Sequence, residues 1–323
     1  MNTREEAEQK GIPLAETKQN MLRRCMRHDY SRRGTYLITI VVANRQPLLG
    51  NLICDDNPRI ILSTLGKHIF DEEIKKIHQH YPAIEMWKTC IMPDHIHMIL
   101  RINDTLPDNA HLGVVIRGFK AGCTKAYRAL TGNDGSLFEE GYNDRILTED
   151  GQLDRWKKYI SDNPRRLALK RRNPDLFKVR YKTRILNRDC DVTGNIFLMD
   201  IPDKMAVIVH RSDSDKEFAI KTEQWLACGA RGGVLVSASI SPREKIVLRE
   251  AMNRKYPIIL LRENGFPPLY KPSGEAFDAC ARGLLLQISP WPYHSARKPI
   301  TRAQCFFLNQ MAEDIAEGGK PRR

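Results

Sequence analysis

The chain has 323 residues, more than one ordinary domain core requires, and this length predicts two domains. Charged residues make up 28% of the chain and hydrophobic residues 41%, which excludes collagen-like, low-complexity and wholly disordered proteins. The 52 Lys and Arg residues outnumber the 39 Asp and Glu residues and give a net charge of +13. This excess favours a polyanionic partner such as nucleic acid or an acidic membrane surface.

The sequence carries no signal for a membrane or for export. No stretch approaches the roughly 18 consecutive apolar residues that a membrane helix needs, and the first residues, MNTREEAEQK, lack the apolar core of a signal peptide. We therefore expect a cytoplasmic protein without a membrane partner. The eight cysteines include no CxxC pair, so neither a zinc knuckle nor a disulfide framework is indicated, and we expect reduced thiols.

The first predicted elements follow a polar start. Residues 1–30 are polar and charged and predict an N-terminal extension. Residues 35–43 are rich in β-branched side chains and predict a strand. Residues 60–80 carry apolar side chains near the helical repeat, so we expect a helix that stops before Pro82.

The next elements complete a small α+β domain. Residues 84–91 and 95–102 predict two strands joined by a short turn. Residues 112–130 predict a second helix, and residues 153–163 predict a third that ends because the residue before Pro164 is pushed out of the helical region. Paired strands with helices packed on one face predict an α+β domain over 31–182.

The pattern changes after residue 183. Four short, nearly continuous apolar runs occupy residues 204–210, 233–238, 256–261 and 283–288. Such runs are typical of strands buried on both faces of a parallel sheet. Helical segments between and after these runs are expected at residues 217–229, 241–255 and 301–317. The alternation predicts an α/β domain over 183–323.

A histidine pair is the most informative feature of the first domain. Residues 92–100 read MPDHIHMIL, and in a strand the side chains of His95, His97 and Ile99 share one face. Two imidazoles at i and i+2 stand about 7 Å apart at their bases, near enough to converge on one divalent metal ion. Two solvated histidines on an exposed strand face are the alternative interpretation.

A tyrosine and an asparagine on the third predicted helix are suited to the same site. Tyr159 and Asn163 are four residues apart and project from one helix face, so an amide oxygen and a phenolic oxygen can lie near the metal. A phenol with a pKa near 10 needs positive charge nearby to act as a nucleophile. Residues 155–182 contain 11 basic and 2 acidic residues and supply that charge. A core or interface aromatic is the alternative for Tyr159.

Several motifs resemble one family in the right order. MPDHIHMIL is similar to the His-hydrophobe-His strand of the HUH single-tyrosine nucleases, and KKYISDNP, residues 157–164, is similar to the nucleophile helix of their transposase branch. Residues 113–120, GVVIRGFK, and residues 137–147, LFEEGYNDRIL, resemble the REP-associated tyrosine transposases. The resemblance covers about residues 30–180 and implies a ferredoxin-like antiparallel sheet with helices on one face.

The resemblance also implies a reaction. His95, His97 and Asn163 would hold Mg²⁺ or Mn²⁺, which would polarise the scissile phosphate of single-stranded DNA. Tyr159 would attack to give a 5′-phosphotyrosyl enzyme and a free 3′-hydroxyl, and a second strand end would then displace the tyrosine. We therefore expect a transposase of the HUH tyrosine type. The alternatives are a domesticated DNA-binding protein without productive transposition and a metal-dependent phosphodiesterase that uses water.

Nine basic residues are the predicted DNA contacts. They are Arg117, Lys120, Arg145, Lys157, Lys158, Arg165, Arg166, Arg171 and Arg172. For the residues on the second predicted helix, a solvated basic face is an equal alternative. The resemblance implies single-stranded or hairpin DNA as the partner, and among the oligomeric states we favour a monomer.

The second domain loosely resembles another superfamily. Residues 234–245, VLVSASISPREK, with the later apolar runs, resemble the Rossmann-like domain of the DNA-processing protein A and lysine-decarboxylase-like proteins. The turn at residues 237–241 would lie at the ligand edge of the sheet, where a helix N-terminus suits a phosphate. The family's glycine-rich turn is absent, so a structural or DNA-contacting module is favoured over a nucleotide site.

Overall fold

The computed structural model describes residues 25, 28–267, 269–296 and 298–318. Contacts between Cα atoms divide the chain into two compact units, Met1–Ala168 and Leu169–Arg323. This division falls earlier than the boundary expected near residue 182, because Leu169 and Phe177 pack in a core of the second unit and strand β7 (Arg180–Ile185) belongs to its sheet. Most of the predicted extension at residues 1–30 lies outside the described residues.

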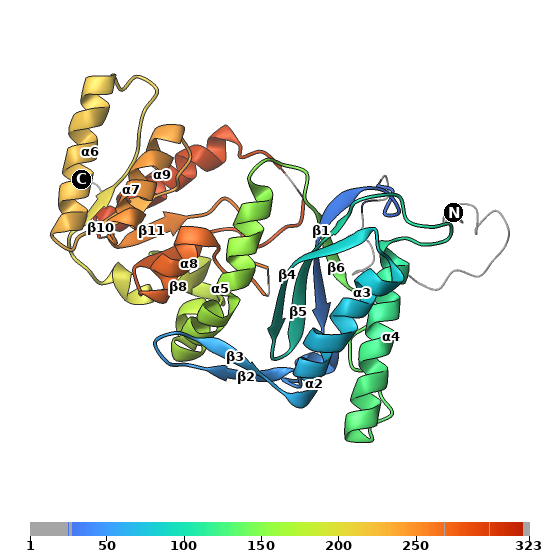
Figure 1. The fold of residues 1–323 in the computed structure, drawn as a ribbon. Coiled ribbons are helices and arrows are strands. Elements are labelled where there is room, and N and C mark those ends of the chain that lie inside the picture. Colours follow the sequence, from blue (N-terminus) through green and yellow to red (C-terminus); the bar gives the residue numbers. More distant parts are fainter. Residues whose placement is uncertain (1–24, 26–27, 268, 297, 319–323) are drawn as a thin grey trace, which may run out of the picture. The chain divides into compact units, whose positions relative to one another are not determined.

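The first unit contains an antiparallel sheet of four strands in the order β4-β5-β1-β6 (Figure 1). The strands are β1 (Gly34–Val41), β4 (Ile84–Met92), β5 (His95–Ile102) and β6 (Asn143–Ile146). The helices between them are α2 (Thr64–His68), the π-helical η3 (Ile69–Glu73), α3 (Ile74–His80) and α4 (Leu112–Thr131). Strand, helix, two strands, helix and strand in this order give the expected ferredoxin-like connectivity.

Helices cover both faces of this sheet, whereas we expected helices on one face. Helices α3 and α4 pack on the face that carries Tyr36, Ile38 and Met98. Helix α5 (Gln152–Arg172) packs on the other face, where its Ile160 contacts a cluster with Leu37 and Ile99. The strands carry apolar side chains on both faces of the sheet, so a helix has to shield each face from solvent.

The helix expected at residues 60–80 begins later. Residues Arg59–Leu62 form strand β3, which pairs with β2 (Gly50–Ile53). The helix starts only at Thr64. The hydroxyl of Ser63 accepts a hydrogen bond from the backbone N–H of Gly66 and caps this helix. The apolar periodicity of a segment does not show that it pairs with another strand, so the sequence placed the start of the helix too early.

Helix α5 continues past the proline that we expected to end it. Pro164 lies inside the helix, which runs on to Arg172. Residues 165–172, RRLALKRR, are strong helix formers, and the buried Ala168 and the partly buried Leu169 anchor the added turns. These contributions exceed the loss of one helical hydrogen bond at the proline.

The second unit contains a sheet of six strands in the order β7-β8-β12-β11-β10-β9. The expected parallel strands are present as β9 (Lys204–Ala206), β10 (Val234–Ser237), β11 (Ile258–Leu261) and β12 (Leu285–Ser289). Strand β8 (Arg188–Gly194) pairs antiparallel with β12 and with β7. The sequence did not predict β7, β8, the short helices η4 (Pro174–Phe177) and η5 (Ile196–Met199), or α8 (Gly274–Ala281).

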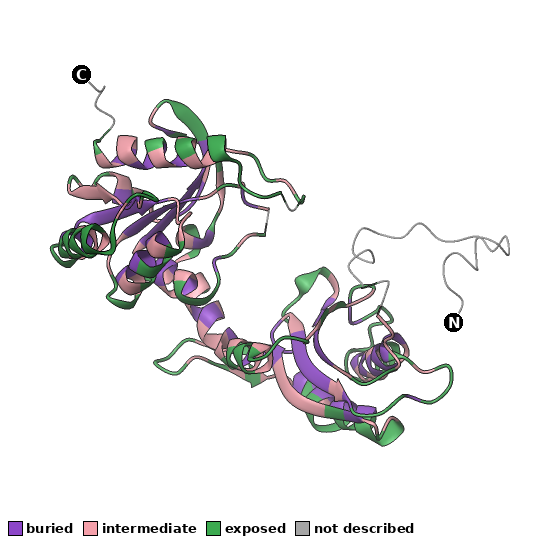
Figure 2. Ribbon diagram, turned by 90° about the horizontal axis from the view of Figure 1, so that it is seen from above, coloured by how far each residue is buried: buried purple, intermediate pink, exposed green. Residues whose placement is uncertain are grey.

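Helices lie on both faces of the second sheet, whose strands β10, β11 and β12 are buried along their whole length (Figure 2). Helices α6 (Asp215–Ala230), α7 (Pro242–Asn253) and α8 pack with Leu235 and Ile258. Helix α9 (Arg302–Ala316) packs with Val236 and Ile259 on the other face. Strands β9 to β12 follow one another in a single direction, whereas dinucleotide-binding folds reverse at a switch point. The Rossmann-like assignment is therefore confirmed only as a parallel α/β sheet.

Two global expectations can be compared with the fold. None of the described helices is both long and apolar enough to cross a membrane. The eight cysteines all lie in the described residues and are free thiols, four of them buried. Burial raises the pKa of the Cys190 thiol to about 11 and that of Cys280 to about 12, so these two are protonated packing residues at neutral pH.

The internal proline of α5 gives a stability prediction. Pro164→Ala restores a backbone donor inside a helix, where proline costs about 3 kcal/mol relative to alanine. The more flexible unfolded chain offsets roughly 1 kcal/mol of this gain. We expect the variant to be about 2 kcal/mol more stable in urea unfolding of the transition that contains α5. A variant that is less stable than the natural protein would show that Pro164 is needed for the path of the helix.

Candidate active site

The two histidines lie where the strand pattern predicts. His95 and His97 point from β5 toward α5, while Ile96 and Met98 point into the main core of the first unit. The two imidazole rings meet edge to face with centroids 4.7 Å apart. His97 is 8% exposed and His95 is partly exposed, so the pair borders solvent on one side.

Each histidine is held by a hydrogen bond at Nδ1. The Nδ1 atom of His97 lies 2.8 Å from Oγ1 of Thr39, its partner across the β1–β5 pairing. The Nδ1 atom of His95 donates to Oδ1 of Asp94 at 2.6 Å, and Asp94 accepts from Arg45 at 3.2 Å. Neither Nε2 atom has a hydrogen-bond partner in the described part of the chain. Metal-binding histidines show this pattern, in which the second ring nitrogen is fixed by an outer partner.

The electrostatics keep the His97 ring able to donate a lone pair. Burial, followed by the charge of His95, lowers the pKa of His97 to about 3, so this ring is neutral at physiological pH. Burial alone would raise the pKa of the Asp94 carboxyl. Hydrogen bonds and charge from His95 and Arg45 outweigh that effect and hold the pKa of Asp94 below its ordinary value.

Helix α5 places Tyr159 beside the histidines. The ring centroid of Tyr159 lies 6.1 Å from that of His97 and 5.2 Å from that of Trp156. The guanidinium of Arg166, two turns along the helix, lies 5.4 Å from the centroid of the tyrosine ring. Arg166 is only 9% exposed, so most of its side chain is enclosed by the protein.

Asn163 follows Tyr159 by one helical turn and is 8% exposed. Its Nδ2 donates to the backbone oxygen of Tyr159 at 3.2 Å, which leaves Oδ1 without a partner among the described residues. His95, His97 and Asn163 therefore share one property: one polar atom of each side chain is bonded within the protein and the other is available. No cluster of three His, Cys, Asp or Glu side chains suited to a metal occurs in the described ranges. A cation bound by His95 and His97 would therefore need Asn163 and solvent as its further ligands.

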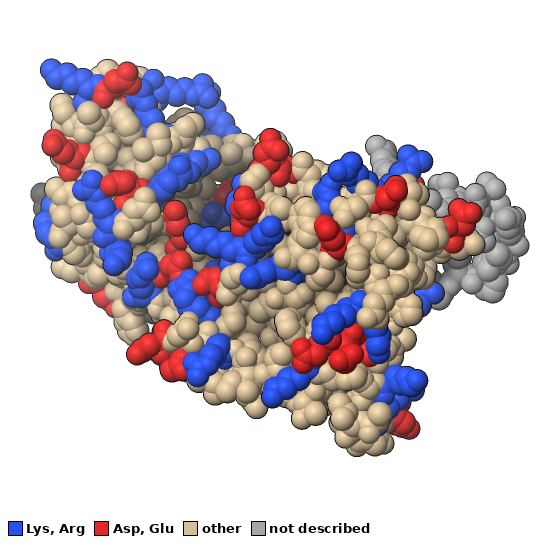
Figure 3. All heavy atoms as spheres, viewed as in Figure 1, with Lys and Arg blue, Asp and Glu red and all other residues tan. Residues whose placement is uncertain are grey.

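Basic and aromatic side chains surround this face of the sheet. The Arg145 guanidinium lies 4.8 Å from the Trp156 ring, and the Lys157 ammonium lies 5.3 Å from the Trp87 ring. Lys158 is exposed on the helix. Arg165 donates to both carboxylate oxygens of Asp162, at 2.5 and 2.9 Å, so part of its charge is neutralised. In Figure 3, Lys and Arg side chains gather over α5, whereas elsewhere on that face basic and acidic side chains are mixed.

The remaining predicted contacts lie elsewhere. Arg117 and Lys120 are on α4, which covers the opposite face of the sheet, and with Lys125 and Arg128 they line a groove of about 450 Å³. Lys120 donates to the backbone oxygens of Glu139 and Gly141, at 2.6 and 2.7 Å. Burial lowers the pKa of Lys120, which supports a structural role.

Arg171 and Arg172 lie in the last turn of α5, are exposed and belong to the second unit. They carry positive charge without a hydrogen bond or ion pair to any described residue.

Sequence reasoning missed the residues that fix the histidines. Asp94 directly precedes His95, and this adjacency was a usable signal for a carboxylate partner. Thr39 is 58 residues away from His97 in the sequence, and only the register of β1 with β5 brings the two together. Arg45 donates to Asp94 from a left-handed backbone conformation, with φ of 52°, that could not be predicted from the sequence.

Comparison with known proteins gives distant similarities. No protein-family model matches the chain. An uncharacterized protein of Haemophilus influenzae (strain ATCC 51907 / DSM 11121 / KW20 / Rd) is 24% identical in an alignment 159 residues long, which covers 44% of this chain and 86% of that protein. A solved REP-associated tyrosine transposase bound to a REP hairpin is similar, with 20% identity and a TM-score of 0.34, over 44% of this chain and 72% of that one. A candidate transposase from Deinococcus radiodurans R1 has 13% identity and a TM-score of 0.28, over 42% and 94%.

The contacts on α4 give a prediction that separates two residues of the groove. Lys120→Ala removes two charge-assisted hydrogen bonds and should destabilise the first unit by about 2 kcal/mol. Arg117→Ala removes an exposed side chain without a described partner, so its stability should stay within about 0.5 kcal/mol of the natural protein. Urea unfolding measures both changes. Equal destabilisation by the two substitutions would contradict the structural role of Lys120.

Proposed function

We propose that the first unit cleaves and rejoins single-stranded DNA, as a metal-dependent transposase with Tyr159 as its nucleophile. The observation that carries the proposal is the arrangement on one sheet face. Two imidazoles with free Nε2 atoms lie beside the ring of Tyr159, and the amide of Asn163 lies one turn further along α5. The same four residues match the HUH tyrosine motifs in the sequence.

The donor set fits a divalent cation. The Nε2 atoms of His95 and His97 and the Oδ1 atom of Asn163 would hold Mg²⁺ or Mn²⁺, with solvent completing the shell. When bound, the cation would supply Lewis-acid polarisation of the scissile phosphate. Thr39 and Asp94 keep the two rings oriented and their Nδ1 atoms occupied, so each ring offers one lone pair in a fixed direction.

The reaction follows from the position of the phenol. A bond forms between Oη of Tyr159 and the phosphorus atom while the bond from phosphorus to the 3′-oxygen breaks. The phenol gives up its proton, the 3′-oxygen of the upstream fragment leaves as a hydroxyl, and the downstream fragment remains on the tyrosine through its 5′-phosphate. Attack by another 3′-hydroxyl reverses these changes and releases the phenol, so joining needs no external energy source. The Arg166 guanidinium beside the ring stabilises negative charge on the tyrosine oxygen as it attacks and as it leaves.

The surroundings suit a single strand or the foot of a hairpin. Trp87 and Trp156 each have a basic side chain within about 5 Å of the ring, a combination used for bases and phosphates of unpaired nucleic acid. Arg145, Lys157 and Lys158 supply further positive charge beside these rings and on the surface of α5. We further propose that a single protomer contains the whole site, because α5 and β5 of one chain bring all four residues together.

A covalent adduct tests the nucleophile. The full chain is incubated with labelled single-stranded hairpin DNA and Mn²⁺, denatured, and separated by electrophoresis. We expect a protein–DNA adduct in the natural protein and its loss, by at least about 1,000-fold, in Tyr159→Phe, because the attacking oxygen is removed. Tyr293→Phe, which removes the hydroxyl of an exposed tyrosine in the second unit, is the matched control and should keep the adduct.

Each other outcome has a definite meaning. Cleavage without an adduct in the natural protein would support the water-using phosphodiesterase. Binding without cleavage of any hairpin would support the domesticated DNA-binding protein. An adduct that persists in Tyr159→Phe at full yield would rule out the proposed nucleophile.

The hydrogen bonds at Nδ1 predict how metal affinity is set. Asp94→Asn and Thr39→Val keep the ligand atoms but weaken their orientation, and such changes typically cost 10- to 100-fold in metal affinity. We expect the Mn²⁺ concentration for half-maximal cleavage to rise by about that factor, with activity recovered at saturating Mn²⁺. Asp104→Asn, an exposed carboxylate away from the histidines, is the control. A lower maximal rate with unchanged Mn²⁺ dependence would contradict the orienting role.

A further inference from the structure

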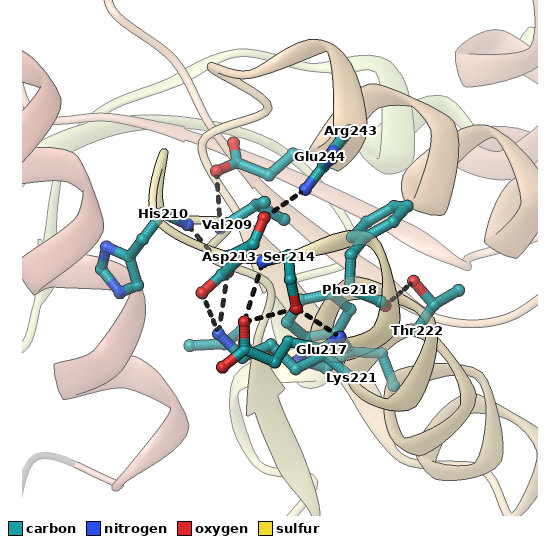
Figure 4. Close-up of polar contacts among 12 residues, drawn as sticks. Val209, His210, Asp213, Ser214, Glu217, Phe218, Lys221, Thr222, Arg243 and Glu244 are labelled. Carbon is teal, nitrogen blue, oxygen red and sulfur yellow. Dashed lines mark hydrogen bonds and ion pairs between the residues drawn. The ribbon is translucent and has the colours of Figure 1, made fainter.

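Polar contacts join the loop that follows β9 to helices α6 and α7 in the second unit (Figure 4). Further contacts join α7 to the loop that follows β10. This is the carboxyl edge of the parallel strands, where the amino ends of the following helices α6 and α7 lie. It is also the edge at which the turn of residues 237–241 was a candidate phosphate site. What this edge can bind therefore depends on which acceptors its backbone N–H groups already bond.

Glu244, in the first turn of α7, takes up three backbone donors here. Its Oε1 accepts from the N–H of Val209 at 3.1 Å, and its Oε2 accepts from Ile240 at 2.7 Å and Ser241 at 3.2 Å. Val209 follows β9, and the other two residues follow β10, so one carboxylate joins two loops. Glu244 is 2% exposed. Backbone N–H groups converging at the amino end of a helix are the arrangement that binds phosphate in other proteins.

The basic side chains in the network are also engaged within the chain. Arg243 donates to the backbone oxygen of Asp213 at 2.7 Å and to the carboxylate of Asp215 at 2.5 Å. Lys221 donates to both carboxylate oxygens of Asp213, at 2.9 and 2.8 Å. Arg243 and Lys221 therefore already pair with carboxylates of this chain.

We propose that the Glu244 carboxylate is an internal anion that fills the anion site at this edge. The loops after β9 and β10 are then held in place without a bound phosphate or nucleotide, and the second unit acts as a preassembled module rather than a nucleotide-binding one. This inference is independent of the DNA cleavage proposed above, because every residue in it belongs to the second unit.

Hydrogen–deuterium exchange of the full chain tests the proposal locally. Peptides that cover residues 205–214 and 237–245 report on the three N–H groups. In the natural protein, sodium phosphate or ATP should leave their exchange unchanged relative to sodium chloride of equal ionic strength. In Glu244→Ala their exchange should be at least about tenfold faster, since charge-assisted hydrogen bonds are lost, and phosphate or formate should slow it again in a saturable way.

Two further variants keep the test decisive. Glu217→Ala removes an exposed capping carboxylate from the neighbouring helix α6, and anions should not rescue its exchange. Glu244→Asp keeps a carboxylate that is one methylene shorter and should give intermediate protection, which covers the case in which the alanine variant does not fold. The proposal is overturned if phosphate or ATP protects these peptides in the natural protein, if Glu244→Asp exchanges like the natural protein, or if anions do not rescue a folded Glu244→Ala.

Discussion

The packing of α5 on the second face of the four-stranded sheet is the constraint on which the candidate site depends. Ile160 is fully buried against Leu37 and Ile99, and its neighbour in the helix is Tyr159. Burial of an isoleucine side chain contributes roughly 2 kcal/mol, so the contact fixes the rotation of the helix about its axis. That rotation brings the phenol to His97 and leaves Lys158 in solvent. An apolar contact thus sets the polar geometry.

The limits of prediction follow the range of the interactions. Alternation in residues 95–100 was sufficient to place His95 and His97 on one face, because strand periodicity is local. Helix spacing likewise placed Tyr159 and Asn163 together, although the proline was wrongly taken as the end of that helix. The bond from Thr39 depends on strand register between distant segments, and the cover on both sheet faces depends on tertiary packing, so neither could be read from local pattern.

The second unit shows the same division. Continuous apolar runs correctly indicated four parallel strands, while the polar β7–β8 hairpin gave no such signal. The serine-rich turn after β10 was interpreted by its resemblance to a ligand edge. The structure places the Glu244 carboxylate from the following helix among the donors of that turn. Its contact with Ser241 is a capping box, which the spacing of the two residues could have indicated, whereas the contact with Val209 depends on the path of the backbone.

Helix α5 contributes residues to two hydrophobic clusters, and this affects how the helix unfolds locally. Its first turns are anchored in one hydrophobic cluster through Ile160, and its last turns in another through Leu169, with Pro164 between them. Helices form and melt cooperatively, so loss of helical structure at residues 169–172 can extend toward Tyr159. Pro164 has no backbone N–H, so the helix has one hydrogen bond fewer at that position. Tyr159 therefore lies on the same continuous helix as residues that pack in the second cluster.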